Sequence, residues 1–260
     1  MKYLTSAVFL WTFVLGSGAH AQSYGSLLDA NSLEGWSVAG GTAEFVLSDG
    51  VLTGITSSGP NTFLMSDETY DDFVLTFEMR LEGQPTENGE DAIPNNSGVQ
   101  IRSRIIDGQV RGYQVDVDAA EHAKLATLFE EGNKRLTLHD AAEFQALRDS
   151  YVPFDDGWNQ IKVVANGGTI QTYFNGFAGK TYVEDRLPGT EQGIYPMMSG
   201  SIGFQLHSPG RITTQGLAVQ WRNINIQPVP EPASLALLTL VAPLVVRRRP
   251  ESAGARDTGK

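Results

Sequence analysis

Three stretches of the sequence, residues 98–104, 113–118 and 201–207, combine strand-like alternation with side chains that can transfer protons or bind hydroxyl groups. Residues two apart in a strand share a face, so the apolar residues of each stretch define a core side and leave a polar side opposite. The polar sides carry Gln100, Arg102 and Arg104, then Gln114, Asp116 and Asp118, then Gln205 and His207. Amides, carboxylates, imidazole and guanidinium groups perform acid–base chemistry and hold hydroxyl groups. Neighbouring strands would form one polar groove, whereas separate strands would give three solvent-facing sides; the periodicity alone allows both.

The elements that would position these residues are short strands. Alternating runs also occur at residues 43–47, 51–55, 73–81, 159–165, 170–174 and 217–226, with turns such as Asn175-Gly176 between them. This pattern predicts an all-β domain, an antiparallel β-sandwich or jelly roll. Residues 119–151 break the pattern, because they are rich in Ala, Leu, Glu and Lys and contain no Pro. They predict short helical turns in a long excursion, which is either a binding loop or decoration.

The two ends of the chain differ from the middle in composition. Residues 1–21 have the charged start, apolar run and Ala19-x-Ala21 site of a signal peptide, so we expect an exported domain over residues 22–227. Residues 228–250 contain Pro230-Glu-Pro232, an apolar run too short for an ordinary span and an Arg cluster, and residues 251–260 form a polar tail. This arrangement resembles the PEP-CTERM sorting signal. The resemblance implies transient membrane anchoring, cleavage by an exosortase-type sorting machinery, and release to the cell envelope, surface or exterior; a plain C-terminal anchor would share the topology.

The overall composition excludes some partners. The net charge of −11 argues against nucleic-acid binding, which requires a basic face. The chain has no Cys, so an exported domain of this sequence is held together by packing and not by disulfides.

Several motifs point to a family as an ordered set. They lie at residues 27–36, 45–54, 70–80, 96–103, 111–118, 157–159, 173–176, 202–207 and 221–226. Among them are Asn96-Ser-Gly-Val-Gln-Ile-Arg-Ser103, Arg111-Gly-Tyr-Gln-Val-Asp-Val-Asp118 and Ile202-Gly-Phe-Gln-Leu-His207. Together they resemble the 3-keto-disaccharide hydrolase family, also described as 3-keto-glucoside 1,2-lyase and 3-keto-2-hydroxy-glucal hydratase domains. The resemblance implies a concanavalin- or laminin-G-like jelly roll whose concave sheet binds a carbohydrate already oxidised at C3.

That resemblance also implies roles for particular residues. Arg102 is the expected cation, which either stabilises the enolate charge or anchors hydroxyl groups. Asp116 and Asp118 are acid or base candidates, and His207 is the expected general base because imidazole titrates near neutral pH. Substrate-binding candidates are Gln100, Gln114, Gln205 and Glu131. The sequence departs from the family pattern at residues 133–137 and in the acidic insertion at residues 82–94, so substrate identity is not fixed by the resemblance.

Other functions fit parts of the sequence. The spacing Asp116-x-Asp118-x-x-Glu121 resembles the paired carboxylates of laminarinase-like retaining glycosidases, although Asp is a methylene shorter than the Glu that such sites use. A non-catalytic carbohydrate-binding or surface-display module would need the same fold and no proton transfer. The cofactor is unknown from sequence; Asp116, Asp118, Glu121 and His122 could hold a divalent cation, or they could form a solvated acidic loop.

Overall fold

A computed structural model of the chain describes residues 25–29, 31–57, 59–84, 93–94, 96–118, 124–133, 136–137, 140–187, 195–208 and 216–229. These residues all belong to one compact unit, residues 1–229. The expected signal peptide and the expected C-terminal sorting segment with its Pro-Glu-Pro motif lie outside the described residues. Within the described part of the chain, no helix is long and apolar enough to cross a membrane.

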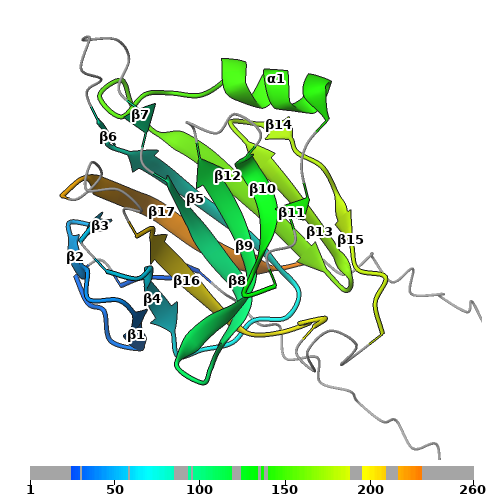
Figure 1. The fold of residues 1–260 in the computed structure, drawn as a ribbon, viewed down its shortest axis with the longest axis horizontal. Coiled ribbons are helices and arrows are strands. Elements are labelled where there is room, and N and C mark those ends of the chain that lie inside the picture. Colours follow the sequence, from blue (N-terminus) through cyan, green and yellow to red (C-terminus); the bar gives the residue numbers. More distant parts are fainter. Residues whose placement is uncertain are drawn as a thin grey trace, which may run out of the picture. The chain divides into compact units, whose positions relative to one another are not determined.

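Two antiparallel sheets make up the domain (Figure 1). The first sheet has the strand order β1-β4-β16-β8-β9-β10-β11. Its strands are β1 (Trp36–Gly40), β4 (Thr62–Ser66), β16 (Ser201–Leu206), β8 (Asn96–Ile106), β9 (Gln109–Asp118), β10 (Lys124–Glu131) and β11 (Leu136–Thr137). The three strands predicted to carry the polar groove are therefore neighbours, because β8 pairs with β16 on one side and with β9 on the other.

The second sheet has the order β14-β13-β12-β5-β17-β3-β2, and β15 also pairs with β13. Its strands are β14 (Phe177–Ala178), β13 (Thr169–Phe174), β12 (Asn159–Asn166), β5 (Phe73–Leu81), β17 (Ala218–Pro228), β3 (Val51–Ile55), β2 (Glu44–Ser48) and β15 (Tyr182–Val183). A separate short pair joins β6 (Gly83–Gln84) to β7 (Ile93–Pro94). The predicted all-β jelly-roll sandwich is confirmed by this arrangement.

The core lies between the two sheets and follows directly from the alternation of the sequence. In β5, every second residue from Phe73 to Leu81 is buried and the residues between them are half-buried. Trp221 of the second sheet is fully buried, and its ring centroid is 5.4 Å from that of Phe204 in the first sheet. Each such side chain contributes about 1.5–3 kcal/mol through removal from water, so packing alone can hold a sandwich that has no disulfides.

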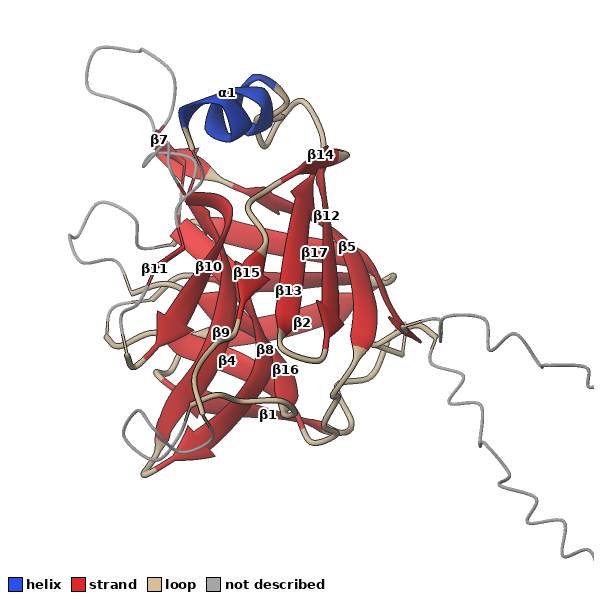
Figure 2. Cartoon of the chain, turned by 90° about the vertical axis from the view of Figure 1, so that its right-hand side faces the viewer, coloured by secondary structure: helices blue, strands red, loops and turns tan. Residues whose placement is uncertain are grey.

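Residues 119–151 differ from the expectation of an excursion with helical turns. One helix does occur there, α1 (Ala141–Asp149), which begins at an Asp140–Glu143 capping box and lies at one end of the sandwich (Figure 2). Residues 124–131, however, form strand β10 of the first sheet, so the helical prediction is wrong for them. Pairing with β9 and burial of Leu125 and Leu128 outweigh the helix propensity of the local composition.

Candidate functional site

A row of hydrogen-bonded amides crosses the side of the first sheet that faces away from the core. Gln100 Nε2 donates to Gln114 Oε1 at 2.6 Å, and Gln114 Nε2 donates to Gln205 Oε1 at 3.1 Å. The row is anchored at one end by Ser103, whose hydroxyl donates to Gln100 Oε1. The amides come from β8, β9 and β16, as the alternation predicted, and each is at most 3% exposed. We call the side of the sheet that carries Gln100, Gln114, Asp116, Asp118 and Gln205 the polar face.

Gly98 makes this row possible. It lies between Gln205 and Asp116 in the register of the sheet. A Cβ at Gly98 would stand 2.7 Å from Cγ of Gln114 and 2.8 Å from its amide atoms. The side chain of Gln114 therefore lies over the glycine, where it reaches both Gln205 and Asp116.

Asp116 is the most perturbed carboxyl group of the polar face. Its side chain is 6% exposed, and its Oδ1 accepts a hydrogen bond of 3.1 Å from Gln114 Nε2. Burial raises the pKa of Asp116 to about 7, the hydrogen bond from Gln114 and the charge of Lys124 lower it, and the charges of Asp118 and Glu131 raise it. A carboxyl group with a pKa near neutrality can give or take a proton under physiological conditions.

A second acidic residue, Asp118, continues the polar face toward His207. Asn96 Nδ2 donates to Asp118 Oδ2 at 3.1 Å, and the buried Asn96 Oδ1 has no hydrogen-bond partner among the described residues. His207 follows β16, and burial lowers the pKa of its imidazole while the charge of Asp118 raises it and that of Lys124 lowers it. The charges of Asp118 and Lys124 therefore act on both Asp116 and His207.

Glu131 lies at the other end of β10, opposite Gly112. Burial raises the pKa of Glu131, and the charge of Arg111 lowers it. Glu131 is one of the charges that act on Asp116, so the structure brings it to the same region as the other predicted residues.

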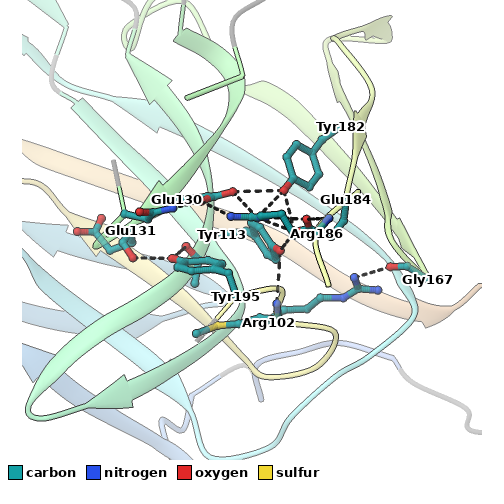
Figure 3. A network of polar contacts seen from close by, with 12 residues as sticks. Arg102, Tyr113, Glu130, Glu131, Gly167, Tyr182, Glu184, Arg186 and Tyr195 are labelled. Atoms are coloured by element: carbon teal, nitrogen blue, oxygen red, sulfur yellow. Dashed lines mark hydrogen bonds and ion pairs between the residues drawn. The ribbon is translucent and has the colours of Figure 1, made fainter. Parts of the chain in front are cut away.

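Arg102 does not share the polar face, and this expectation is corrected. The register shifts between Ile101 and Arg104, and Arg102 itself has a φ of +48°. This bulge turns the guanidinium away, where it donates to Gly167 O at 2.7 Å (Figure 3). It also donates to Asp71 O at 2.8 Å and to Asp72 Oδ1 at 2.7 Å. Arg102 therefore ties together two loops at the rim of the sandwich.

Lys124 and Asn96 belong to the site and were not predicted from sequence. Lys124 is opposite Asp118 in the register, and Thr127 is opposite Asp116. Residues three apart lie on opposite faces of a regular strand. The bulge at Ala126, which has a φ of +54°, puts Lys124 and Thr127 on the same face. Asn96 begins the motif Asn96-Ser-Gly-Val-Gln-Ile-Arg-Ser103, and its polar side chain at the start of a strand is the signal that could have identified it as a site residue.

Apolar side chains border the amides on both sides. Phe63 is opposite Gln205, Met65 is opposite Gly203, and both are buried with Val110 in a small cluster of their own. On the other side, the half-buried Phe129 is opposite Gln114. A surface of amides and carboxylates that is flanked by apolar side chains suits a ligand ring with polar edges and apolar faces.

A different ionisable cluster lies where β9 and β10 meet β15 of the other sheet (Figure 3). The guanidinium of Arg186 donates to both carboxylates of Glu130 and Glu184, and Tyr182 O–H donates to both as well. Tyr113 O–H donates to Glu184 Oε2 at 2.7 Å. We call Tyr113, Glu130, Tyr182, Glu184 and Arg186 the arginine clasp. No sequence pattern pointed to it, because its members come from distant elements.

The described residues contain no group of three or more His, Asp or Glu side chains that could hold a metal ion. Glu121 and His122, two of the candidate ligands, lie outside the described residues.

Comparison with known proteins gives the family. A sequence profile of the family described as "3-keto-alpha-glucoside-1,2-lyase-like domain" matches residues 23–227. The chain belongs to this family. No curated protein matches the sequence of this lyase-like domain significantly.

Solved structures share its fold at low identity. A protein of unknown function with a galectin-like fold from Bacillus subtilis is 14% identical, with a TM-score of 0.53 over 80% of this chain and 98% of that one. A protein from Parabacteroides distasonis ATCC 8503 named as a candidate glycosyl hydrolase is 15% identical, with a TM-score of 0.52 over 80% of this chain and 94% of that one. These likenesses support the jelly-roll fold of the lyase-like domain.

Chemically, the polar face offers two proton carriers with pKa values shifted in opposite directions. Burial raises the pKa of Asp116 and lowers that of His207, so that near pH 7 the carboxyl is partly protonated and the imidazole is neutral. A partly protonated carboxyl and a neutral imidazole can act as an acid and a base.

Proposed function

We propose that this domain binds a carbohydrate oxidised at C3 on its polar face and cleaves it as a 3-keto-glycoside lyase and hydratase. The observation that carries the proposal is that Asp116, whose pKa is about 7, and the neutral His207 both lie within reach of the charges of Asp118 and Lys124, next to a buried row of amides. Family membership over residues 23–227 supports the same chemistry.

The reaction needs only proton transfers because the ketone does the activating. A carbonyl at C3 acidifies the C2–H bond, so the His207 imidazole can take that proton and the electron pair passes to the C3 oxygen. The enolate then expels the C1 substituent, and the C1–O bond breaks as Asp116 delivers its proton to the leaving oxygen. Water adds across the resulting C1–C2 double bond, with hydroxyl at C1 and hydrogen at C2, so the net result is hydrolysis.

The amide row has a positioning role in this proposal. Gln100, Gln114 and Gln205 hold one another by hydrogen bonds, so their side chains are fixed before any sugar binds. Fixed donors and acceptors lower the entropy cost of orienting a hydroxylated ring. Asn96 Oδ1 is a buried acceptor without a partner among the described residues, and a sugar hydroxyl is a suitable donor for it.

Turnover of matched substrates tests the function. We expect the purified domain to release the aglycone from a 3-keto-glucoside and not from the corresponding unoxidised glucoside, and to incorporate deuterium at C2 in D₂O. Equal cleavage of both substrates would indicate an ordinary glycosidase. Binding of the ketosugar without turnover would indicate a non-catalytic carbohydrate-binding module.

We further propose that the protein is exported and sorted through its C-terminal segment. The supporting features are the Ala19-x-Ala21 site and the Pro230-Glu-Pro232 tripeptide followed by an apolar run and Arg247 to Arg249. Mass measurement of the protein purified from its native host is the test. Termini near Gln22 and near Pro230 are expected, whereas an intact C-terminus on the mature protein would exclude cleavage there.

A further inference from the structure

The proposed reaction creates negative charge on the C3 oxygen, and the site therefore needs a cation or strong donor at that oxygen. Arg102 was the expected cation, but its guanidinium is fully engaged with Asp71, Asp72 and Gly167 at the rim of the sandwich. Its side chain is 1% exposed, so reorientation toward the polar face would break the Asp72 ion pair and remove this donor from the carbonyls of Asp71 and Gly167. Another residue must supply the charge.

Lys124 supplies a positive charge next to Asp118 on the polar face. It begins β10, it lies opposite Asp118 on the neighbouring strand, and the bulge at Ala126 puts it on the same side as Thr127, which is opposite Asp116. The bulge is held from the other sheet, because Thr172 Oγ1 donates to the Ala126 carbonyl at 2.7 Å. The placement of Lys124 is therefore fixed by the packing of the two sheets.

The electrostatic neighbours of Lys124 are the groups that the reaction uses. Its charge lowers the pKa of Asp116 and also that of His207. Asp118, opposite Lys124, is held by Asn96 through a hydrogen bond of 3.1 Å to Oδ2. One cation thus lies among an acid, a base and a carboxylate that is itself oriented by an amide.

We propose that Lys124 is a catalytic residue whose ammonium group binds the C3 carbonyl oxygen and stabilises the enolate. This inference rests on the proposed function. When His207 removes the C2 proton, the electron pair moves to the C3 oxygen, and the ammonium of Lys124 balances the new charge without giving up a proton. The interaction is weak with the hydroxyl of an unoxidised sugar and strong with an enolate, so Lys124 also makes the site selective for the ketone.

Two variants of Lys124 and one control test the assignment. Lys124→Met removes the charge and keeps the length of the side chain, and Lys124→Arg keeps the charge. The control is Lys162→Met, because Lys162 is exposed on the second sheet and lies over the ring of Tyr173. With a 3-keto-glucoside, we expect kcat to fall about 10²–10³-fold in Lys124→Met, to fall less in Lys124→Arg, and to stay within twofold in Lys162→Met.

A second measurement separates catalysis from a structural role. The imidazole pKa of His207, followed by NMR without substrate, should rise in Lys124→Met because a nearby positive charge is lost, and thermal unfolding should show that the variant is folded. In a third variant, Lys124→Ala, rate recovery on addition of a small alkylamine is also expected, since a free ammonium can enter the space that the truncation leaves. A merely structural lysine would give no such recovery.

The outcomes distinguish this inference from the function on which it rests. A wild-type protein that does not turn over the ketosugar overturns both. Wild-type turnover together with a folded Lys124→Met variant that keeps its rate within threefold overturns the assignment of Lys124 and leaves the proposed function standing. Reduction by borohydride that links the ketosugar covalently to Lys124 would also overturn it, in favour of an imine.

Discussion

The polar face and the arginine clasp share strand β9 and use similar side chains to opposite effect. In the clasp, burial acts to raise the pKa of Glu184, but hydrogen bonds from Arg186, Tyr113 and Tyr182 outweigh it and hold that pKa at about 2. On the polar face, Asp116 accepts one amide hydrogen bond, and burial raises its pKa to about 7. Carboxylates that are fully matched hold the sheets together, and a carboxyl that is left undermatched is available for chemistry.

The largest expected effect follows from neutralising the undermatched carboxyl. Asp116→Asn removes the proposed acid, so kcat/KM for a 3-keto-glucoside should fall about 10²–10⁴-fold. Stability should not fall with it. Folding raises the pKa of Asp116 from its ordinary 3.8 to about 7, so ionisation of this group destabilises the fold progressively as pH rises through that window. Asp116→Asn should therefore stabilise the domain above pH 7, by at most about 4 kcal/mol.

The exposed Asp155 provides the matched control, because Asp155→Asn changes the same group in solvent. Kinetics and urea unfolding at pH 5 and pH 8 measure both effects. Loss of stability together with loss of activity in Asp116→Asn would make Asp116 a member of a structural cluster like the clasp.

Removing the charge of Arg186 from the arginine clasp should lower stability and leave activity unchanged. Arg186→Met leaves Glu130 and Glu184, which are 2% and 4% exposed at their side chains, without their cation. Breaking such a buried pair costs about 3–5 kcal/mol, so we expect a large drop in the free energy of unfolding and unchanged kcat per folded molecule. Arg104→Met on the exposed end of β8 should change stability by less than about 0.5 kcal/mol. A specific loss of kcat in a folded Arg186→Met protein would place the clasp in the active site.

The sequence predicted the part of the site that depends on strict alternation. Gln100, Gln114, Asp116 and Gln205 lie where a period of two puts them, and the nine predicted strand segments all occur. The prediction failed where the backbone departs from that period. The bulge after Ile101 turns Arg102 away, and the bulge at Ala126 brings Lys124 in.

The positions of these bulges depend on contacts between distant segments, which no local pattern reports. Gly200 closely approaches the backbone of Arg102 and Ser103, and Thr172 of the other sheet holds the Ala126 carbonyl. The arginine clasp could not be predicted from the sequence for the same reason, since the packing of the two sheets brings Glu130 and Arg186 together. The chemical types of the residues do not by themselves reveal which carboxylates have hydrogen-bond and ion-pair partners.

The pH dependence of turnover should show both shifted groups. If His207 acts as the base, kcat/KM falls on the acidic side as the imidazole protonates, with a pKa below its ordinary 6.5 because burial lowers it. If Asp116 acts as the acid, kcat/KM falls on the alkaline side with a pKa of about 7. Each limb should approach a tenfold loss per pH unit.

The same measurement on two variants assigns the limbs. Asp116→Asn should lose the alkaline limb from its residual activity, and His207→Gln should lose the acidic limb. A wild-type profile that is flat between pH 5 and 9 would remove both groups from the rate-determining proton transfers.

The smallest expected effect tests how tightly the polar face is held. Gly98→Ala places a Cβ at 2.7 Å from Gln114 Cγ, so Gln114 must move away from Gln205 and Asp116. We expect a loss of about 1–3 kcal/mol in stability from overpacking and a several-fold rise in KM, because the amide row no longer orients the sugar. Gly25→Ala is the control, since a Cβ there meets nothing within 4 Å. The alkaline pKa of the pH profile should also rise, because the hydrogen bond from Gln114 lowers the pKa of Asp116. An unchanged KM and pKa in Gly98→Ala would show that the amide row only packs and that Asp116 owes its pKa to burial and neighbouring charges, without a contribution from Gln114.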